Sequence, residues 1–168
     1  YEGFQQSETE QGFARLGNPD APVQIMEYAS FTCPGCKVFH DEAMATVRDY
    51  VETGNVSVTY VPMTTGSYPN PEGAAWAAIC AGEQGKFWEY HDLLFGWQGE
   101  FSFTGNRLEA GVEGLGLNHE DWSACFFSQR PKDVMQLASI QSSQASVNST
   151  PSISVGGVLV QPNLGGLT

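Results

Sequence analysis

The stretch that decides the fold runs from Val23 to Cys36 and reads VQIMEYASFTCPGC. Residues 23–28 are mostly apolar and alternate well enough to predict a buried parallel strand, which ends over residues 29–32. A helix is expected to follow, because apolar residues recur there at roughly helical spacing. These residues are Val38, Phe39, Ala43, Val47 and Val51. Gly54 is suited to end this helix as a C-cap residue.

The chain continues with a second strand at residues 56–62, which is β-branched at alternate positions and ends at Pro62. A strand, a helix and a strand in this order require a right-handed crossover and two parallel strands. Five helix-compatible segments follow, at residues 71–82, 86–97, 105–114, 119–127 and 131–147. Two final strands, at residues 150–155 and 158–161, flank a Gly-Gly pair and predict a β-hairpin.

This order of elements predicts an α/β fold in which an inserted helical subdomain separates the β-α-β unit from the hairpin. The core is expected to comprise residues 16–66 and 148–168, and the inserted subdomain residues 67–147. Residues 1–15 are polar and irregular, and we expect them to form a loose N-terminal arm.

The composition limits the classes of partner. The chain has 168 residues, 41% of them hydrophobic and 12% aromatic, which is enough apolar material for a proper core. Its 19 acidic residues outnumber 7 basic ones, so the formal charge is −12. A surface this acidic repels phosphate backbones and anionic headgroups, and we expect neither nucleic acid nor an anionic membrane as a partner. No apolar run reaches the roughly 18 residues of a membrane span, and no signal peptide is visible at the start of the chain.

The pair Cys33 and Cys36 lies where a strand meets the start of a helix. Unpaired backbone N–H groups and the positive end of the helix dipole stabilise a thiolate at such a position. Pro34 suits the first helical turn, where a missing N–H costs nothing. We therefore predict that Cys33 is the exposed and partly ionised nucleophile, and that the less exposed Cys36 closes the ring as the resolving thiol.

Other interpretations of this pair remain open. A CxxC pair can be half of a metal site or simply two buried thiols. His40 stands four residues after Cys36, so Cys33, Cys36 and His40 could begin a ligand set, although no fourth ligand is evident and His40 fits better on a helix face without a chemical task. A zinc site built from all four cysteines is disfavoured, because zinc ribbons use two short-spaced pairs and this chain has one. We therefore expect neither a metal nor a cofactor.

Two further features favour redox chemistry. Glu27 lies six residues before Cys33 in the apolar strand, which places it beneath the dithiol, where a carboxyl could relay the proton of Cys36. A hydrogen-bonded structural glutamate is the alternative. Thr150-Pro151 opens a strand far along the chain, and a proline leading into a strand beside a dithiol suggests a cis peptide in a tight turn. Such a loop would offer the Thr150 backbone to an extended substrate, although Thr-Pro alone is a weak signal.

Taken together, these stretches resemble the DsbA-like branch of the thioredoxin superfamily over about residues 14 to 160. The matching stretches are GNPDAPV at 17–23, EYASFTCPGC at 27–36, AICA at 78–81, QGKFWEYHD at 84–92, LF at 94–95 and TP at 150–151. The resemblance implies a thioredoxin fold with a helical insertion, attack by Cys33, resolution by Cys36, proton transfer assisted by Glu27 and a cis Pro151. The residues expected to bind substrate are Pro34, Gly35, Thr150 and Pro151.

The other two cysteines, Cys80 and Cys125, lie in segments that are expected to be helices with apolar faces. Isolated buried cysteines can act as small hydrophobic residues. The resemblance to exported enzymes favours a different outcome, since an oxidising compartment pairs thiols that lie within reach of each other. We therefore predict a structural disulfide between Cys80 and Cys125 within the helical subdomain.

The sequence departs from the family pattern at two places. Pro34 and Gly35 separate the cysteines, and the histidine that helps to hold the thiolate in the most oxidising family members is absent, which argues against a strongly oxidising potential. Family members usually finish with another helix, for which the stretch Gly165–Thr168 is too short. We expect this last helix to be trimmed or missing.

These observations predict an enzyme that donates, removes or reshuffles disulfides in unfolded or reduced exported proteins, in the periplasm or another extracytoplasmic compartment. A membrane redox partner is expected to recharge the dithiol, and its nature would decide between oxidation, reduction and isomerisation. No dimerisation segment is visible, so a monomer is expected. The main alternative is a non-catalytic thioredoxin-fold binding module with a structural or metal-binding CxxC. A glutathione-binding transferase generally needs no CxxC, and the pair argues against it.

Overall fold

The computed structural model describes residues 1–160, which form six helices and one six-stranded sheet. The strands are β1 (Gln6–Glu8), β2 (Ala14–Leu16), β3 (Val23–Ala29), β4 (Val56–Pro62), β5 (Ser152–Val155) and β6 (Val158–Val160). The helices are α1 (Pro34–Glu52), α2 (Pro71–Gly82), α3 (Phe87–Trp97), α4 (Gly105–Gly114), α5 (His119–Phe126) and α6 (Arg130–Gln144). The expected last strand residue, Gln161, and the stretch Gly165–Thr168 lie outside the described residues.

The strands lie in the order β1-β2-β4-β3-β5-β6. β3 and β4 are parallel, as the predicted β-α-β unit requires, and every other neighbouring pair is antiparallel. Within the parallel pair Glu27 lies opposite Tyr60, so both side chains project from the same face of the sheet. The predicted hairpin of β5 and β6 is also present. Its turn residues Gly156 and Gly157 have φ angles of 58° and 83°, a backbone conformation that favours glycine.

The expectation of a loose N-terminal arm is wrong. Strands β1 and β2 form an antiparallel hairpin, and β2 pairs with β4 and thereby extends the sheet. The apolar residues Phe13, Ala14 and Leu16 at the end of this segment are buried in the core. They anchor the hairpin in the core. The residues before them are mostly polar, which is why their composition did not predict strands.

Three of the helices, α2, α4 and α5, start at side chains that accept hydrogen bonds from their first turns. Asn70 accepts from the Gly73 N–H before α2, Thr104 from the Arg107 N–H before α4, and Asn118 from the Asp121 N–H before α5. Each such bond satisfies one of the unpaired backbone N–H groups of a helix start. The predicted starts of these helices at residues 71, 105 and 119 are therefore confirmed.

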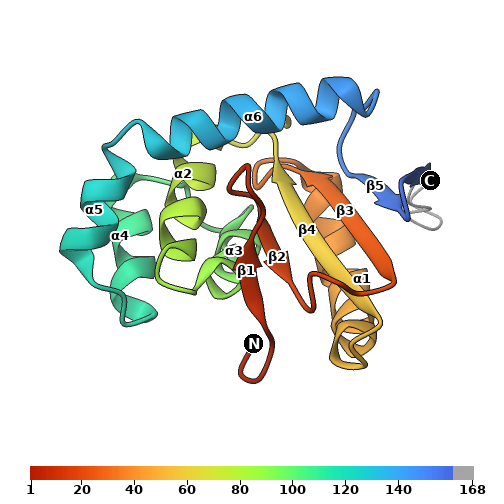
Figure 1. Cartoon of the computed structure of the whole chain (residues 1–168). Coiled ribbons are helices and arrows are strands. Elements are labelled where there is room, and N and C mark those ends of the chain that lie inside the picture. The colour runs from red at the N-terminus through yellow and green to blue at the C-terminus, as the bar shows by residue number, and fades with distance from the viewer. Residues whose placement is uncertain (161–168) are drawn as a thin grey trace.

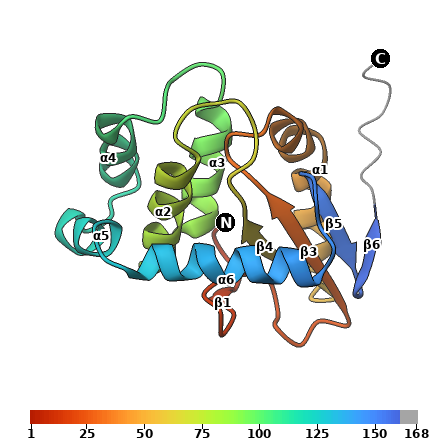
Figure 2. The same ribbon diagram turned by 90° about the horizontal axis from the view of Figure 1, so that it is seen from above.

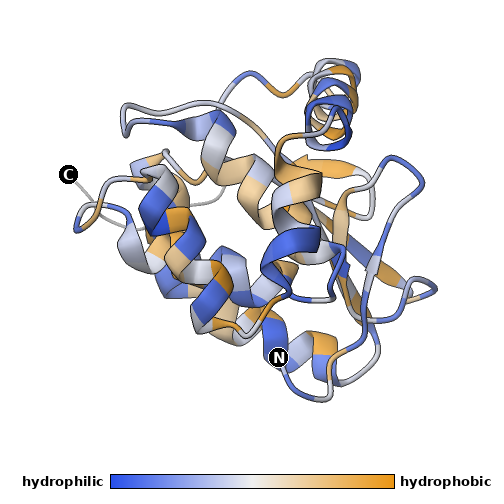
Figure 3. Ribbon diagram, turned by 90° about the vertical axis from the view of Figure 1, so that its left-hand side faces the viewer, coloured by the Kyte–Doolittle hydropathy of each residue, from blue (hydrophilic) through white to orange (hydrophobic). Residues whose placement is uncertain are grey.

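The molecule has two parts that share α6. Helices α2 to α5 stand beside the sheet, and α6 returns the chain from α5 across to β5 (Figure 1). Helices α1 and α6 lie on opposite faces of the sheet (Figure 2). Hydrophobic residues gather in the middle of the molecule, while the loops at its rim are largely hydrophilic (Figure 3). Among residues 1–160, none of the helices has the length and hydrophobicity needed to cross a membrane.

The helical part is held together by a disulfide and by aromatic packing. Cys80 of α2 and Cys125 of α5 form the disulfide, with their Cα atoms 5.7 Å apart. Beside it, the indole N–H of Trp122 donates to the Ala77 carbonyl at 3.1 Å, and the Trp122 ring stacks on Phe126. Both sulfurs are buried, so the bridge joins two helices in the interior of the subdomain.

Candidate active site

The dithiol loop connects the end of β3 to the start of α1. Cys33 is the N-cap residue of α1 with an extended backbone, and Pro34 occupies the first helical turn. The Cys33 carbonyl accepts from the N–H groups of Cys36 and Lys37, at 3.1 and 3.2 Å, which begins the helix. Both cysteines are free thiols. Cys33 retains 7% of its accessible surface and Cys36 none, so the order of exposure is the predicted one, although Cys33 is buried and not exposed as expected.

The two thiols differ in acidity. The pKa of Cys33 is lowered to about 5, chiefly because the Cys36 thiol hydrogen-bonds to it. Burial opposes this shift, while Thr150 and the backbone N–H groups of Cys36 and Gly35 favour the thiolate. The pKa of Cys36 is raised, because its proton is held against Cys33 and its sulfur is buried. At neutral pH the pair therefore carries one thiolate, on Cys33, and one thiol, on Cys36.

The loop before β5 faces the dithiol. The Thr150–Pro151 peptide is cis, and the Sγ atom of Cys33 lies 3.6 Å from the Thr150 carbonyl oxygen. Pro151 is buried, Thr150 and Gly35 are half-buried, and Pro34 is exposed. The structure thus brings Thr150 to the Cys33 sulfur, beside Pro34 and Gly35, although Thr150 lies 117 positions further along the chain.

Glu27 is buried in the core, with 1% of its surface accessible. Neither of its carboxylate oxygens has a hydrogen-bond partner among the described residues, which argues against a hydrogen-bonded structural glutamate. Burial raises the pKa of Glu27 to about 7, against a small lowering by the charge of His40. The pKa of Tyr60 is raised first by burial and then by the charges of Glu27, Cys36 and Cys33. Tyr60 therefore lies within range of the charges of Glu27 and of both thiols.

His40 has contacts that the sequence did not predict. Its Nε2 atom lies 3.0 Å from Oδ1 of Asp92, and its Nδ1 atom lies 2.9 Å from Oδ1 of Asp41. Burial lowers the pKa of His40, but these two carboxylates outweigh it and raise the pKa overall. His91 also reaches Asp92, with its Nδ1 atom 3.0 Å from the same oxygen.

This cluster bears on the metal alternative. Among residues 1–160, the ligand-type side chains that converge near the dithiol helix are His40, His91 and Asp92, and neither Cys33 nor Cys36 belongs to the group. The negative charge of the Asp92 carboxylate is already compensated, because the Tyr1 hydroxyl donates to it at 2.8 Å and the Arg48 guanidinium lies 3.7 Å away. The cluster is an ion-pair and hydrogen-bond network that fixes α1 against α3.

The loop after β4 holds the dithiol loop from one side. The hydroxyls of Ser30 and Thr32 donate to the Thr65 carbonyl at 2.8 and 2.6 Å, and the Tyr68 N–H donates to the Thr32 carbonyl at 3.3 Å. The hydroxyl of Thr65 also contacts the hydroxyl of Thr150. Gly66 packs directly on this backbone, since a Cβ atom there would overlap the Thr32 carbonyl. The loop thus ties the dithiol loop to the cis-proline loop.

A second side chain holds the dithiol loop from the other side. The amide of Gln98, at the end of α3, donates to the carbonyls of Phe31 and Cys33. No motif in the sequence marks Gln98 or Thr65, because each acts through a contact between segments distant along the chain.

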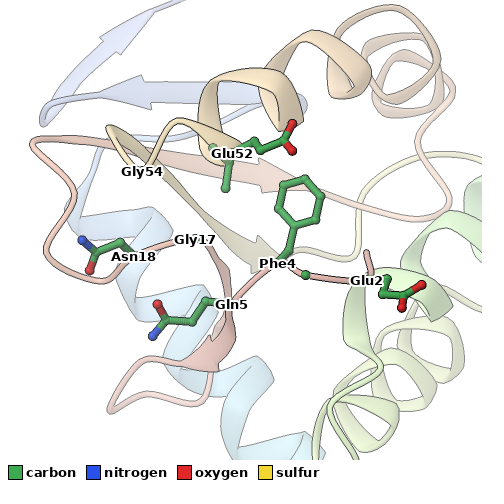
Figure 4. Close-up of a pocket in the computed structure, with 9 residues that line it drawn as sticks. Glu2, Phe4, Gln5, Gly17, Asn18, Glu52 and Gly54 are labelled. Atoms are coloured by element: carbon green, nitrogen blue, oxygen red, sulfur yellow. The ribbon is translucent and has the colours of Figure 1, made fainter.

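A surface pocket of about 250 Å³ lies at the other end of α1 (Figure 4). Its lining includes Glu2, Phe4, Gly17, Glu52 and Gly54, and it contains none of the predicted site residues. Because α1 begins at the dithiol and ends at this pocket, a helix of 19 residues separates them. The pocket is therefore not part of the dithiol site.

Comparisons with known proteins agree with this geometry. A family model described as "Thioredoxin" matches residues 8–165. The chain is similar to Disulfide bond formation protein D of Bacillus subtilis, with 31% identity over 86 residues that cover 48% of this chain and 37% of that protein. It is also similar to a part of Na(+)/H(+) antiporter NhaA 1 of Salinispora arenicola, with 42% identity over 88 residues that cover 50% of this chain and 13% of that protein. The chain therefore spans well under half the length of these two relatives.

A solved structure extends the likeness to nearly the whole fold. Oxidised BdbD from Bacillus subtilis superposes with a TM-score of 0.82 at 21% identity, covering 94% of this chain and 89% of that one. The predicted fold class, an α/β thioredoxin fold with an inserted helical subdomain, is confirmed. The chain therefore belongs to the thioredoxin family, in the DsbA-like branch that its sequence resembles.

Proposed function

We propose that the chain is a protein thiol–disulfide oxidoreductase that works through Cys33 and Cys36. The observation that carries this proposal is the asymmetry of the pair. Cys33 stands at a helix start with 7% of its surface accessible and its pKa lowered to about 5, while Cys36 is fully buried with its pKa raised. One sulfur is thus suited to attack and the other to resolve. The name of the Bacillus subtilis relative, a disulfide bond formation protein, supports the same reading.

In the oxidising direction, a substrate thiolate attacks Sγ of Cys33 in the Cys33–Cys36 disulfide. The bond between the two cysteines breaks, and its electron pair leaves on Cys36, which takes up a proton. A second substrate thiolate then attacks the substrate sulfur of the mixed disulfide and displaces Cys33 as a thiolate. The substrate dithiol is oxidised to a disulfide, and the cysteine pair is reduced by two electrons. The lowered pKa makes Cys33 a good leaving group, and reduction of a substrate is the reverse sequence.

Glu27 is proposed to supply and remove the proton of Cys36. The Cys36 thiolate forms in the core, where an unpaired charge is costly, so a nearby proton donor speeds its release. A carboxyl with a pKa of about 7 can give and take a proton near neutral pH. Its lack of hydrogen-bond partners among residues 1–160 leaves both oxygens available for this exchange.

The substrate is proposed to be an extended segment of an unfolded or reduced exported protein. Its cysteine would approach between Pro34, Gly35 and the cis-proline loop, where the Thr150 backbone faces the attacking sulfur. The disulfide between Cys80 and Cys125 supports a site of action in an oxidising, extracytoplasmic compartment, because cytosolic thiols are kept reduced. A monomer recharged by a membrane redox partner fits this proposal. The dipeptide Pro34-Gly35 supports a potential less oxidising than the about −120 mV of DsbA.

The test is catalysed insulin reduction together with oxidation of a dithiol peptide. Cys33→Ser is expected to lower both rates to the uncatalysed level, while Cys36→Ser is expected to accumulate mixed disulfides with the substrate. The double variant Cys80→Ala/Cys125→Ala is the control and is expected to turn over. Normal turnover by Cys36→Ser would contradict the assigned roles. Bound zinc together with no turnover by the unmodified protein would favour the binding-module alternative.

A further inference from the structure

The side chain of Gln98 reaches from the end of α3 to the dithiol loop. Its Nε2 atom donates to the Phe31 carbonyl at 2.7 Å and to the Cys33 carbonyl at 3.2 Å. Gln98 is buried, with 6% of its surface accessible. A primary amide has two N–H donors, and here each has one acceptor, so the donor side of the group is fully used.

The backbone of Gln98 explains how its side chain comes to this place. Its N–H still bonds to the Leu94 carbonyl, but its ψ of 124° has left the helical range. The residue therefore ends α3 and turns toward the dithiol. The aromatic rings of α3 pack in the core above Phe31, which fixes the position of the helix. The packing of α3 therefore fixes the position of the Gln98 side-chain amide.

Gln98 completes a set of contacts on three consecutive carbonyls. Its amide donates hydrogen bonds to the carbonyls of Phe31 and Cys33, and the Tyr68 N–H donates one to the Thr32 carbonyl. A backbone held at three consecutive residues has little freedom to rotate. These residues decide where the Cys33 sulfur lies relative to the first N–H groups of α1 and to the Thr150 carbonyl.

We propose that Gln98 is a positioning residue, whose amide holds the Phe31 and Cys33 carbonyls so that the Cys33 thiolate faces the first amides of α1. The inference deepens the proposed function, on which it rests for its meaning in catalysis. Without the amide, two buried carbonyls lose a donor and the loop relaxes. The thiolate then loses part of the contact with the N–H groups of Gly35 and Cys36 that stabilises it.

The experiment compares two side-chain amides that both bind backbone groups. In Gln98→Met the volume is nearly kept and the donor is lost. The matched control is Gln84→Met, because Gln84 donates to the Asn118 carbonyl at 3.0 Å and accepts from its N–H at 2.8 Å, away from the dithiol. The pH midpoint of Cys33 alkylation is measured in the reduced protein. Gln98→Met is expected to raise it by about one pH unit, the worth of one net hydrogen bond to a buried group, and Gln84→Met to leave it unchanged.

A second measurement uses the unmutated protein, so that it does not depend on the folding of a variant. The side-chain N–H protons of Gln98 are expected to exchange with solvent far more slowly than those of the exposed Gln11 in an NMR experiment. Exchange as fast as that of Gln11, or a wild-type alkylation midpoint in Gln98→Met, would overturn the positioning role. If the unmutated protein catalyses no disulfide exchange while the midpoint still depends on Gln98, the proposed function fails and the positioning role stands.

Discussion

The chain contains two cysteine pairs that are buried to a similar degree but differ in the polar groups around them and in their bonding. Cys80 and Cys125 come from two packed helices, are separated by 45 positions and form a buried disulfide. Cys33 and Cys36 lie three positions apart at one helix start and are free thiols, although they are buried to a similar degree. The first pair is surrounded by aromatic packing, and the second by backbone N–H groups and carbonyls.

The difference shows that the same chemical group serves opposite purposes according to what surrounds it. A thiolate is stabilised where hydrogen-bond donors point at it, and the start of α1 provides the Cys36 thiol and unpaired backbone N–H groups for Cys33. Four experiments test this contrast.

The largest effect is expected from removing the buried bridge. Cys80→Ala/Cys125→Ala should lower the free energy of unfolding by about 4 kcal/mol, because the bridge closes a loop of 46 residues, counting both ends of the separation of 45. Urea denaturation measures this loss. The control is Cys33→Ser/Cys36→Ser in comparison with the unmodified protein whose Cys33–Cys36 disulfide is closed, where the short loop predicts a much smaller change. A loss below 1 kcal/mol for the first variant would show that the two pairs differ less than their surroundings suggest.

The second largest effect concerns the acidity of the Cys33 thiol. Alkylation of Cys33 should show a pH midpoint near 5, so that at pH 6 its thiolate fraction exceeds that of an ordinary cysteine with a pKa of about 8.5 by roughly 300-fold. Mass spectrometry after timed alkylation measures the midpoint. In Cys36→Ala the midpoint should rise, since the Cys36 thiol is the largest cause of the lowered pKa, yet stay below 8.5 because the helix amides remain. An ordinary midpoint in the unmodified protein would remove the contrast between the pairs.

The third experiment concerns Glu27, the buried acid that is proposed to serve the Cys33–Cys36 pair. Because the folded protein raises the pKa of Glu27 from 4.5 to about 7, the native state keeps a proton that the unfolded state has lost in that range. Stability from this group is therefore highest at low pH and falls by about 3 kcal/mol as pH rises from about 4.5 to above 7. Glu27→Leu should remove this slope and slow turnover between pH 6 and 8.

Urea denaturation at several pH values isolates the Glu27 contribution, because the raised pKa of His40 adds a fall of the same sign to both proteins. Parallel stability curves for the variant and the unmodified protein, with equal turnover, would favour a purely structural glutamate.

The smallest effect is expected at the junction of the two loops. Thr65→Val removes the hydroxyl that contacts Thr150 and should cost about 1 kcal/mol of stability, the worth of one hydrogen bond, while slowing disulfide exchange. Thr104→Val is the matched control, because it removes the cap of α4 at a similar cost, about 1 kcal/mol, without touching the dithiol. If both variants exchange disulfides equally well, the junction has no part in the reaction.

The parts of this molecule that could be predicted from sequence are those encoded by local patterns. The strand, CxxC and helix start lie within one stretch, so the exposure order of Cys33 and Cys36 follows from their positions at a helix terminus. The strands of the N-terminal hairpin have three residues each, too few for a periodicity to be recognised. Gln98 lies 65 positions from Cys33, and no repeating pattern links residues that meet only after the chain has folded.

Gly66 limits which residues the loop beside the dithiol can carry. Its φ of 97° and its packing on the Thr32 carbonyl exclude every other residue, because any side chain would push into the backbone that carries Cys33. Its neighbours Thr64 and Ser67 are exposed and face no such limit. A library that diversifies this loop to change substrate preference can therefore vary Thr64 and Ser67, while position 66 has to be held constant through every round of selection.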